Sequence, residues 1–189
     1  KLKHTGRDCT PTQAMQMVLK DKTQTFIVDI RTRPGYSLVG HPTVACHIPF
    51  MFWTGKMGHK DYGLAVNPDF GQDLLARFNP QTDTLVFMCR SGKRSCLASE
   101  AAVKAGFKAD KVFSMLGGFE GDKVKCQVSA YNGKRMLGGW KNEGLPWTYK
   151  IDPKLAYQPD LPQQETCQRS KADTDRSPGL APRGICIYS

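Results

Sequence analysis

The segment LVFMCRSGKRS, residues 85–95, decides how the rest of this sequence is interpreted. Four apolar residues lead directly to Cys89, and three cations follow within the next five positions. An apolar run that reaches a Ser-Gly turn and continues into an alanine-rich segment is typical of a buried strand followed by a helix. The pattern therefore predicts that the Cys89 sulfur lies above the N-terminus of that helix, where backbone N–H groups point at it.

The surroundings of Cys89 favour a reactive thiol. A helix N-terminus and neighbouring Lys or Arg side chains stabilise the thiolate, which is the nucleophilic form of cysteine. Lys93 and Arg94 lie where the helix dipole disfavours positive charge, and a bound anion would relieve this conflict. The alternative is a buried structural cysteine next to solvated surface cations. We favour a nucleophile that attacks a bound anion.

Strand-like and helix-like segments alternate on both sides of this turn. Apolar strands are predicted at 25–30, 45–50, 85–89 and 111–115, and helices at 10–22, 69–78 and 95–107. Strands separated by helices indicate an α/β fold with a mostly parallel central sheet and helices on both faces. The loops that follow the strands then share one edge of the sheet, where such folds bind ligands.

One of the predicted helices has a recognisable start, and two have a predicted buried face. Thr10, with Gln13 three positions later, forms the pattern of a capping box at the start of the first helix. Helical spacing places Leu19 among the buried residues of this helix, and Leu97 with several alanines among those of the helix after Cys89.

These segments occur in the order found in single-domain rhodaneses, the thiosulfate sulfurtransferase-like family, which the chain resembles over residues 10–149. The likeness rests on the opening helix TPTQAMQMVL (10–19), VDIR (28–31), Gly40-His41 with VACHIPF (44–50), CRSGKRS (89–95), GGFEG (117–121) and GWKNEGLPWT (139–148). The cysteine loop is the specific part of this set. The resemblance implies a three-layer rhodanese-like α/β fold.

The resemblance also implies roles for individual residues. Cys89 would be the catalytic residue and would take sulfane sulfur as a persulfide, without a metal or another cofactor. The active loop implied by the family motif consists of Arg90, Ser91, Gly92, Lys93, Arg94 and Ser95. Its backbone amides would hold the terminal sulfur, Arg90 and Lys93 would bind the anionic donor, and Arg94 would order the loop or the donor.

The length of the loop bears on the substrate that the resemblance implies. Phosphatase relatives have five residues between the cysteine and the arginine, whereas four residues separate Cys89 from Arg94. Mercaptopyruvate-specific relatives usually have Gly directly after the cysteine, and this chain has Arg90. We therefore expect thiosulfate or a similar anion as donor and a thiophilic acceptor. The alternative function is a persulfide carrier that docks protein partners and passes sulfur between them.

Other residues are expected to support the site. Asp29 and Arg31 are expected to form an ion pair beneath the active loop, and a direct substrate role for Arg31 is the less favoured reading. The acidic residue common in the family at position 35 is Gly35 here, so that position supplies no carboxylate to Arg31. Cys96 could resolve a persulfide on Cys89, although an inward packing role is favoured.

Two segments are longer than a compact member of the family needs. The first, residues 51–66, is aromatic, and the second, residues 121–139, contains four cations. Both are expected near the active edge, as a lid, as a docking surface for an acidic protein partner, or as solvated additions.

Composition sets the remaining expectations. The net charge is +10, and residues 158–189 carry four cations and four anions, so the excess lies in residues 1–157. We expect one domain over 1–157 and a flexible tail over 158–189. The seven cysteines show no metal-site spacing, no nucleic-acid platform is recognisable, and no apolar run could span a membrane. Because residue 1 is Lys, a mature periplasmic chain and a cytoplasmic one are both compatible with the sequence.

Overall fold

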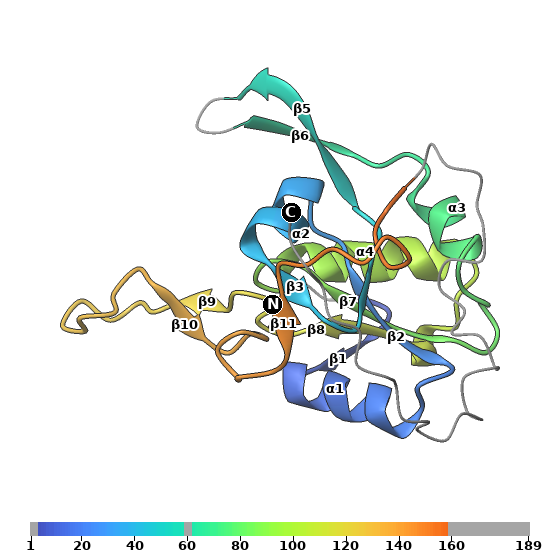
Figure 1. Cartoon of the computed structure of the whole chain (residues 1–189), viewed down its shortest axis with the longest axis horizontal. Coiled ribbons are helices and arrows are strands. Elements are labelled where there is room, and N and C mark those ends of the chain that lie inside the picture. Colours follow the sequence, from blue (N-terminus) through green and yellow to red (C-terminus); the bar gives the residue numbers. More distant parts are fainter. Residues whose placement is uncertain (1–3, 59–61, 159–189) are drawn as a thin grey trace, which may run out of the picture.

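The computed structural model describes residues 4–58 and 62–158 and has a five-stranded parallel sheet at its centre (Figure 1). In spatial order its strands are β1 (Arg7–Cys9), β8 (Val112–Met115), β7 (Thr84–Met88), β2 (Thr25–Asp29) and β4 (Ala45–His47). The three inner strands are mostly apolar and almost wholly buried, as expected for a parallel sheet that is covered on both faces.

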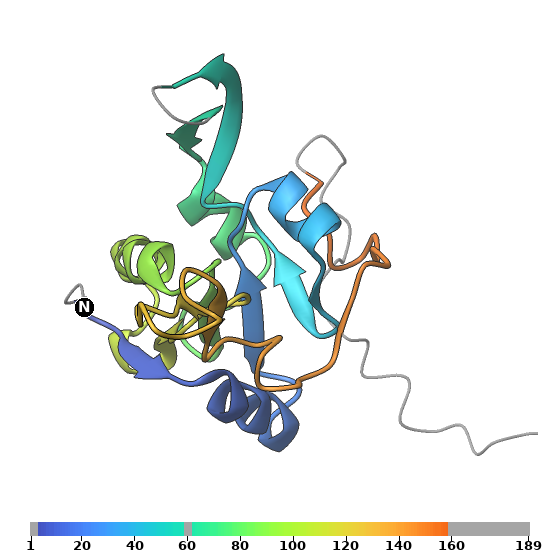
Figure 2. The ribbon, with the colours of Figure 1, turned by 90° about the vertical axis from the view of Figure 1, so that its left-hand side faces the viewer.

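Helices cover the two faces of this sheet and give a three-layer arrangement. Helix α1 (Pro11–Lys20) lies on one face, while α3 (Phe70–Leu75) and α4 (Lys93–Lys104) lie on the other (Figures 1 and 2). Two buried clusters fill the spaces between the layers, one beneath α3 and α4 and the other beneath α1. The layers confirm the predicted α/β fold with helices on both faces.

Helix α1 begins as the sequence predicts, but its buried face differs. Thr10 and Gln13 exchange side-chain-to-backbone hydrogen bonds and form a complete capping box. The predicted burial of Leu19 is wrong, because Ala14 and Val18 face the sheet and Leu19 is exposed. In α4 the predicted burial of Leu97 is also wrong, because the inward face is built from smaller residues, namely Ser95, Cys96, Ala98, Ser99 and Ala102.

Several short elements were not anticipated from the sequence, and two of them adjoin the central strands. The edge strand β1 is only three residues long and pairs with β8. Helix α2 (Arg33–Val39) follows β2 directly and is capped by the Thr32 side chain, which accepts a hydrogen bond from the Gly35 N–H. Both elements are short and carry charged residues, so the apolar periodicity that identifies longer elements is absent.

Three further strand pairs lie outside the central sheet. They are the antiparallel pairs β3 (His41–Pro42) with β11 (Trp147–Thr148), β5 (Met51–Met57) with β6 (Tyr62–Val66), and β9 (Asp122–Lys123) with β10 (Arg135–Leu137). The β5–β6 hairpin and the β9–β10 arm project from the body of the molecule in different directions (Figure 1). They fall in the two long segments, 51–66 and 121–139, that the sequence singled out.

The expected tail begins at Gln158, and residues 159–189 lie outside the described part of the chain. Across residues 4–58 and 62–158, no helix has both the length and the apolar character that crossing a membrane would require.

Candidate active site

Cys89 is the first residue after β7, and its side chain is only 1% exposed. The backbone N–H of Gly92 donates a hydrogen bond to the Cys89 Sγ over 3.1 Å. Gly92 is the residue before α4 and has a left-handed conformation with φ of 95°, which favours glycine. The turn therefore brings the chain back over the sulfur and begins the helix beside it.

The Ser95 hydroxyl lies beside the sulfur and belongs to a buried network of hydrogen bonds. The Ser95 Oγ lies 3.9 Å from the Cys89 Sγ, donates to the Gly92 carbonyl over 2.8 Å, and lies 2.8 Å from the Ser114 Oγ of β8. Cys96 is also buried, and its Sγ lies 3.6 Å from the same Ser114 oxygen. This network joins the start of α4 to strand β8, and no pattern in the sequence indicated a role for Ser114.

The turn at 117–121 packs directly against the cysteine loop. The Phe119 N–H donates to the Cys89 carbonyl over 2.8 Å, and the Glu120 N–H donates to the Arg90 carbonyl over 2.9 Å. Gly118 has φ of 56°, and a Cβ at this position would lie 2.3 Å from the Cys89 carbonyl oxygen. The close approach of the two backbones therefore requires glycine at 118.

The three cations of the loop differ in their surroundings. The Arg90 Nε donates to the Glu120 Oε2 over 3.0 Å, while the Arg90 side chain remains about half exposed. Lys93 and Arg94 have no hydrogen bond or ion pair to any side chain within residues 4–58 and 62–158. The sequence analysis predicts that Arg90 binds the anionic donor. It does not predict the contact of Arg90 with Glu120, because these two residues are thirty positions apart.

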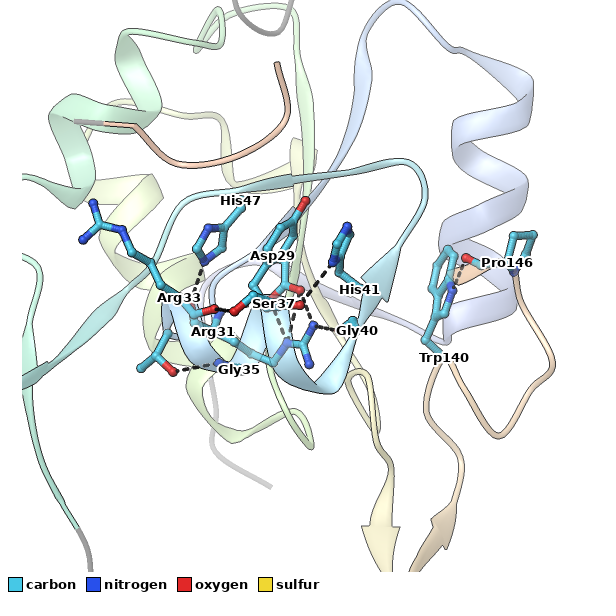
Figure 3. Close-up of polar contacts among 12 residues, drawn as sticks. Asp29, Arg31, Arg33, Gly35, Ser37, Gly40, His41, His47, Trp140 and Pro146 are labelled. Atoms are coloured by element: carbon cyan, nitrogen blue, oxygen red, sulfur yellow. Dashed lines mark hydrogen bonds and ion pairs between the residues drawn. The ribbon is translucent and has the colours of Figure 1, made fainter. Parts of the chain in front are cut away.

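Asp29, the last residue of β2, and Arg31 lie next to each other (Figure 3). The buried Arg31 guanidinium contacts the Asp29 carboxylate at 2.5 and 2.9 Å and donates to the Gly40 carbonyl over 2.7 Å. Its central carbon lies 4.2 Å from the centroid of the Phe119 ring. Arg31 is thus enclosed and touches the residue whose N–H binds the Cys89 carbonyl, while Gly35 contributes no side chain to it.

A stack of three rings lies next to this ion pair. The Tyr36 ring lies 3.7 Å from that of His41 and 4.3 Å from that of His47, measured between centroids. The His47 Nε2 lies 2.9 Å from the Arg31 carbonyl oxygen and donates to it (Figure 3). Burial lowers the pKa of His47 to about 4, so the ring is neutral at physiological pH. Burial also raises the pKa of Tyr36, so the phenol stays protonated.

Within the described ranges, no group of three His, Cys, Asp or Glu side chains is arranged to hold a metal ion. The loop thus offers a buried sulfur, a helix start that donates to it, and unpaired cations nearby. Such a site can stabilise negative charge on sulfur and bind a small anion.

Comparisons with known proteins identify a matching family and similar sequences. Residues 10–125 match the model of the rhodanese-like domain family. An uncharacterised Rickettsia rickettsii protein, named as a homologue of RP600, is 27% identical over 139 residues, which cover 73% of this chain and 94% of that protein. The chloroplastic thiosulfate sulfurtransferase 16 of Arabidopsis thaliana is 32% identical over 92 residues, or 49% of this chain and 68% of that protein.

A solved structure is similar over most of the chain. The crystal structure of Rv0390 from M. tuberculosis superposes with a TM-score of 0.60 and 28% identity, and the match covers 78% of this chain and all of that one. The family match and this structural similarity agree with the fold that the sequence predicts.

Proposed function

This chain belongs to the rhodanese-like domain family, and we propose that it is a sulfurtransferase in which Cys89 carries sulfane sulfur as a persulfide. The observation that carries the proposal is the hydrogen bond from the Gly92 N–H to the Cys89 Sγ at the start of α4. A backbone donor at a helix start stabilises negative charge on sulfur, which both the thiolate and the persulfide require.

The proposed reaction has two half-reactions. The Cys89 thiolate attacks the outer sulfur of thiosulfate, a new S–S bond forms, and sulfite leaves with the electron pair of the broken S–S bond. A thiophile such as cyanide or a thiolate then attacks the terminal sulfur and forms a bond to it. The electron pair of the persulfide bond returns to Cys89 and regenerates the thiolate.

No separate base is needed if the thiol is already ionised. Among residues 4–58 and 62–158, no histidine or carboxylate makes a hydrogen bond with the Cys89 Sγ. This supports a mechanism in which the helix start, rather than a proton acceptor, activates the sulfur.

The cations of the loop support an anionic donor. Lys93 and Arg94 are the cations whose charge is not neutralised by a described side chain, so they are the proposed contacts of the thiosulfate dianion. Arg90 is proposed to contribute through the part of its guanidinium that Glu120 does not occupy. Asp29 and Arg31 are proposed to support the loop through Phe119.

The test is a steady-state assay of thiosulfate with cyanide as acceptor. Ping-pong kinetics, which appear as parallel lines in double-reciprocal plots, are expected because sulfite leaves before the acceptor reacts. A folded protein with no thiosulfate turnover would contradict thiosulfate as donor. Turnover with a protein persulfide donor in place of thiosulfate would favour the carrier function.

One observation favours that second candidate, a persulfide carrier. Glu120, two residues before β9, binds Arg90 of the loop, and Arg135 of β10 donates to the Gly121 carbonyl over 2.8 Å. Three exposed lysines of the arm, Lys123, Lys125 and Lys134, would suit an acidic protein partner. A triple Lys→Glu change would then abolish transfer from a protein donor and leave thiosulfate turnover intact.

A further inference from the structure

One face of the β5–β6 hairpin is apolar along its whole length. The cross-strand pairs Met51–Val66 and Trp53–Leu64 place four side chains on the same side of the hairpin. The register shifts before the tip pair Met57–Tyr62, but the Tyr62 ring centroid lies 5.7 Å from that of Trp53, so this pair lies on the same side. This set, which we term the apolar hairpin face, contains no charged residue. Five of its members are between 47% and 71% exposed, namely Trp53, Met57, Tyr62, Leu64 and Val66.

The opposite side of the same hairpin has a different composition. It carries Thr54, Lys56 and Ala65, together with Phe52, which is partly buried at the base near Tyr157. The hairpin stands away from the central sheet (Figures 1 and 2). A two-stranded hairpin is at best marginally stable in water by itself, so an exposed face of this kind indicates an interaction surface.

We propose that the apolar hairpin face packs against the same face of a second copy of the chain and forms a two-fold symmetric dimer. If the two hairpins run in opposite directions, Trp53 and Leu64 lie at the centre on the symmetry axis. The tip pair, Met57 and Tyr62, then covers the base residue Val66 of the other copy. A two-fold contact requires a surface that is complementary to itself, and a continuous apolar face meets this requirement.

The area of the face is sufficient for a specific but modest dimer. Trp53 and Tyr62, as aromatic residues, bury roughly 150–250 Å² each when fully covered. Together with the somewhat smaller Met57, Leu64 and Val66, the five side chains, each about half exposed or more, expose roughly 500 Å² per copy. Two copies would then bury about 1,000 Å², which is near the lower limit for a biological interface. We therefore expect a dissociation constant on the order of 10 μM.

The high net charge of +10 per copy does not oppose this arrangement. β5 has seven residues and an extended strand of that length spans about 23 Å, so antiparallel hairpins keep the two bodies apart by more than twice the ~8 Å screening length at physiological salt. Because no charge lies in the face itself, association should depend little on salt. An acidic partner at this face would show the opposite behaviour.

The backbone of the hairpin disfavours insertion into lipid as the explanation. Among the strands of residues 4–58 and 62–158, β5 and β6 pair only with each other, so each has one edge whose N–H and C=O groups lack a neighbouring strand in that part of the chain. Unpaired backbone groups are not tolerated in the hydrocarbon region of a membrane. They are compatible with packing of one face against protein while the edges remain in water.

The experiment is sedimentation equilibrium of the full chain at about 1–200 μM, in buffers with 50 and 500 mM salt. The wild type is expected to dimerise, with a dissociation constant that changes less than about threefold between the two salt concentrations. Leu64→Lys places a charge at the centre of the face and should raise the dissociation constant at least about 30-fold. Ala65→Lys, one residue away on the opposite side, is the matched control and should dimerise like the wild type.

The fluorescence of Trp53 provides a second readout. Its emission should shift to shorter wavelength as the wild type dimerises, and this concentration-dependent shift should be absent from Trp53→Phe. Circular dichroism and the thiosulfate assay check that each variant is folded, so loss of the dimer cannot be confused with loss of the fold.

Three results would overturn the proposal. The first is a monomeric wild type at every concentration. The second is a dissociation constant that Leu64→Lys and Ala65→Lys raise equally, or one that Leu64→Lys leaves unchanged. Either result would place the dimer contact outside the apolar hairpin face. The third is a monomer that co-sediments with phosphatidylcholine–phosphatidylserine vesicles and loses this binding in Leu64→Lys, which would assign the face to lipid.

Discussion

The Glu120 carboxylate lies 3.0 Å from the Nε of Arg90, the residue that follows Cys89. The same carboxylate oxygen lies 3.9 Å from the Arg135 Nε. One acidic residue therefore links the cysteine loop to the base of the β9–β10 arm. Its negative charge also lies close to the region where an anionic sulfur donor would bind.

Glu120→Gln should lower the KM for thiosulfate by about two- to fivefold, because it removes a negative charge near the dianion while Gln retains the hydrogen-bonding shape. Glu143→Gln is the matched control, because Glu143 binds Thr12 on α1 and has no contact with the loop. Steady-state kinetics of both variants measure the difference. A raised KM in Glu120→Gln alone would mean that Glu120 serves mainly to position Arg90.

Lys93→Ala should raise the KM for thiosulfate about tenfold, the effect expected when one charge-assisted contact to a partly desolvated anion is lost. Lys104→Ala, in the last turn of the same helix, removes the same charge far from the loop and should leave KM unchanged. Added salt should weaken thiosulfate binding in the wild type. Equal KM values for wild type and Lys93→Ala would show that this lysine does not contact the donor.

Gly118→Ala should abolish sulfur transfer and destabilise the fold by about 3 kcal/mol or more, since the new Cβ would collide with the Cys89 carbonyl. Gly138→Ala is the control for backbone conformation alone. Its φ of 60° is similar, but a Cβ there meets no atom within 4 Å, so the cost should be about 1 kcal/mol and activity should remain. Urea unfolding and the thiosulfate assay compare the two. Similar losses of stability and activity in both variants would contradict the predicted collision between a Cβ at position 118 and the Cys89 carbonyl.

His47 should make the fold sensitive to acid. Its pKa is about 4 in the folded state and about 6.5 when unfolded, so between these values the unfolded chain binds a proton that the folded chain does not. The contribution of His47 to the free energy of unfolding is fully present above pH 6.5, and it falls by about 3 kcal/mol as the pH drops to 4. Urea unfolding at pH 7 and pH 4 measures it.

His47→Gln should remove this part of the pH dependence, because glutamine can still donate to the Arg31 carbonyl and does not titrate. The variant should therefore lose less stability than the wild type between pH 7 and pH 4. If stability falls equally with pH in both proteins, His47 binds a proton as readily in the folded state as in the unfolded one, which would contradict the prediction.

The sequence predicts the features that depend on local pattern. The apolar run before Cys89, the Ser-Gly turn and the alanine-rich helix follow one another along the chain, and so do Thr10 and Gln13 of the capping box. Helix and strand periods therefore suffice to predict four of the five strands of the central sheet and the helices α1, α3 and α4. They fail at Leu97, where small polar residues face inward because α4 packs closely over the sheet beside Ser114.

Contacts between distant segments could not be predicted from local sequence patterns. The ion pair of Arg90 with Glu120 and the hydroxyl contact of Ser95 with Ser114 join residues thirty and nineteen positions apart. Nothing in the local sequence distinguishes these side chains from solvated polar residues. Strand β1 was missed for a related reason, since its three residues pair with β8 through the backbone and show no apolar alternation.

The most direct test of Cys89 as the sulfur carrier is mass spectrometry of the protein after treatment with thiosulfate. Peptide mapping should find one added sulfur, about 32 Da, on Cys89, and cyanide should remove it. Cys89→Ser should fold normally and gain no such mass. An adduct confined to Cys96 or to Cys126, an exposed free cysteine between β9 and β10, would contradict the assignment of Cys89 as the sulfur carrier. A Cys89→Ser variant that still transfers sulfur would contradict it too.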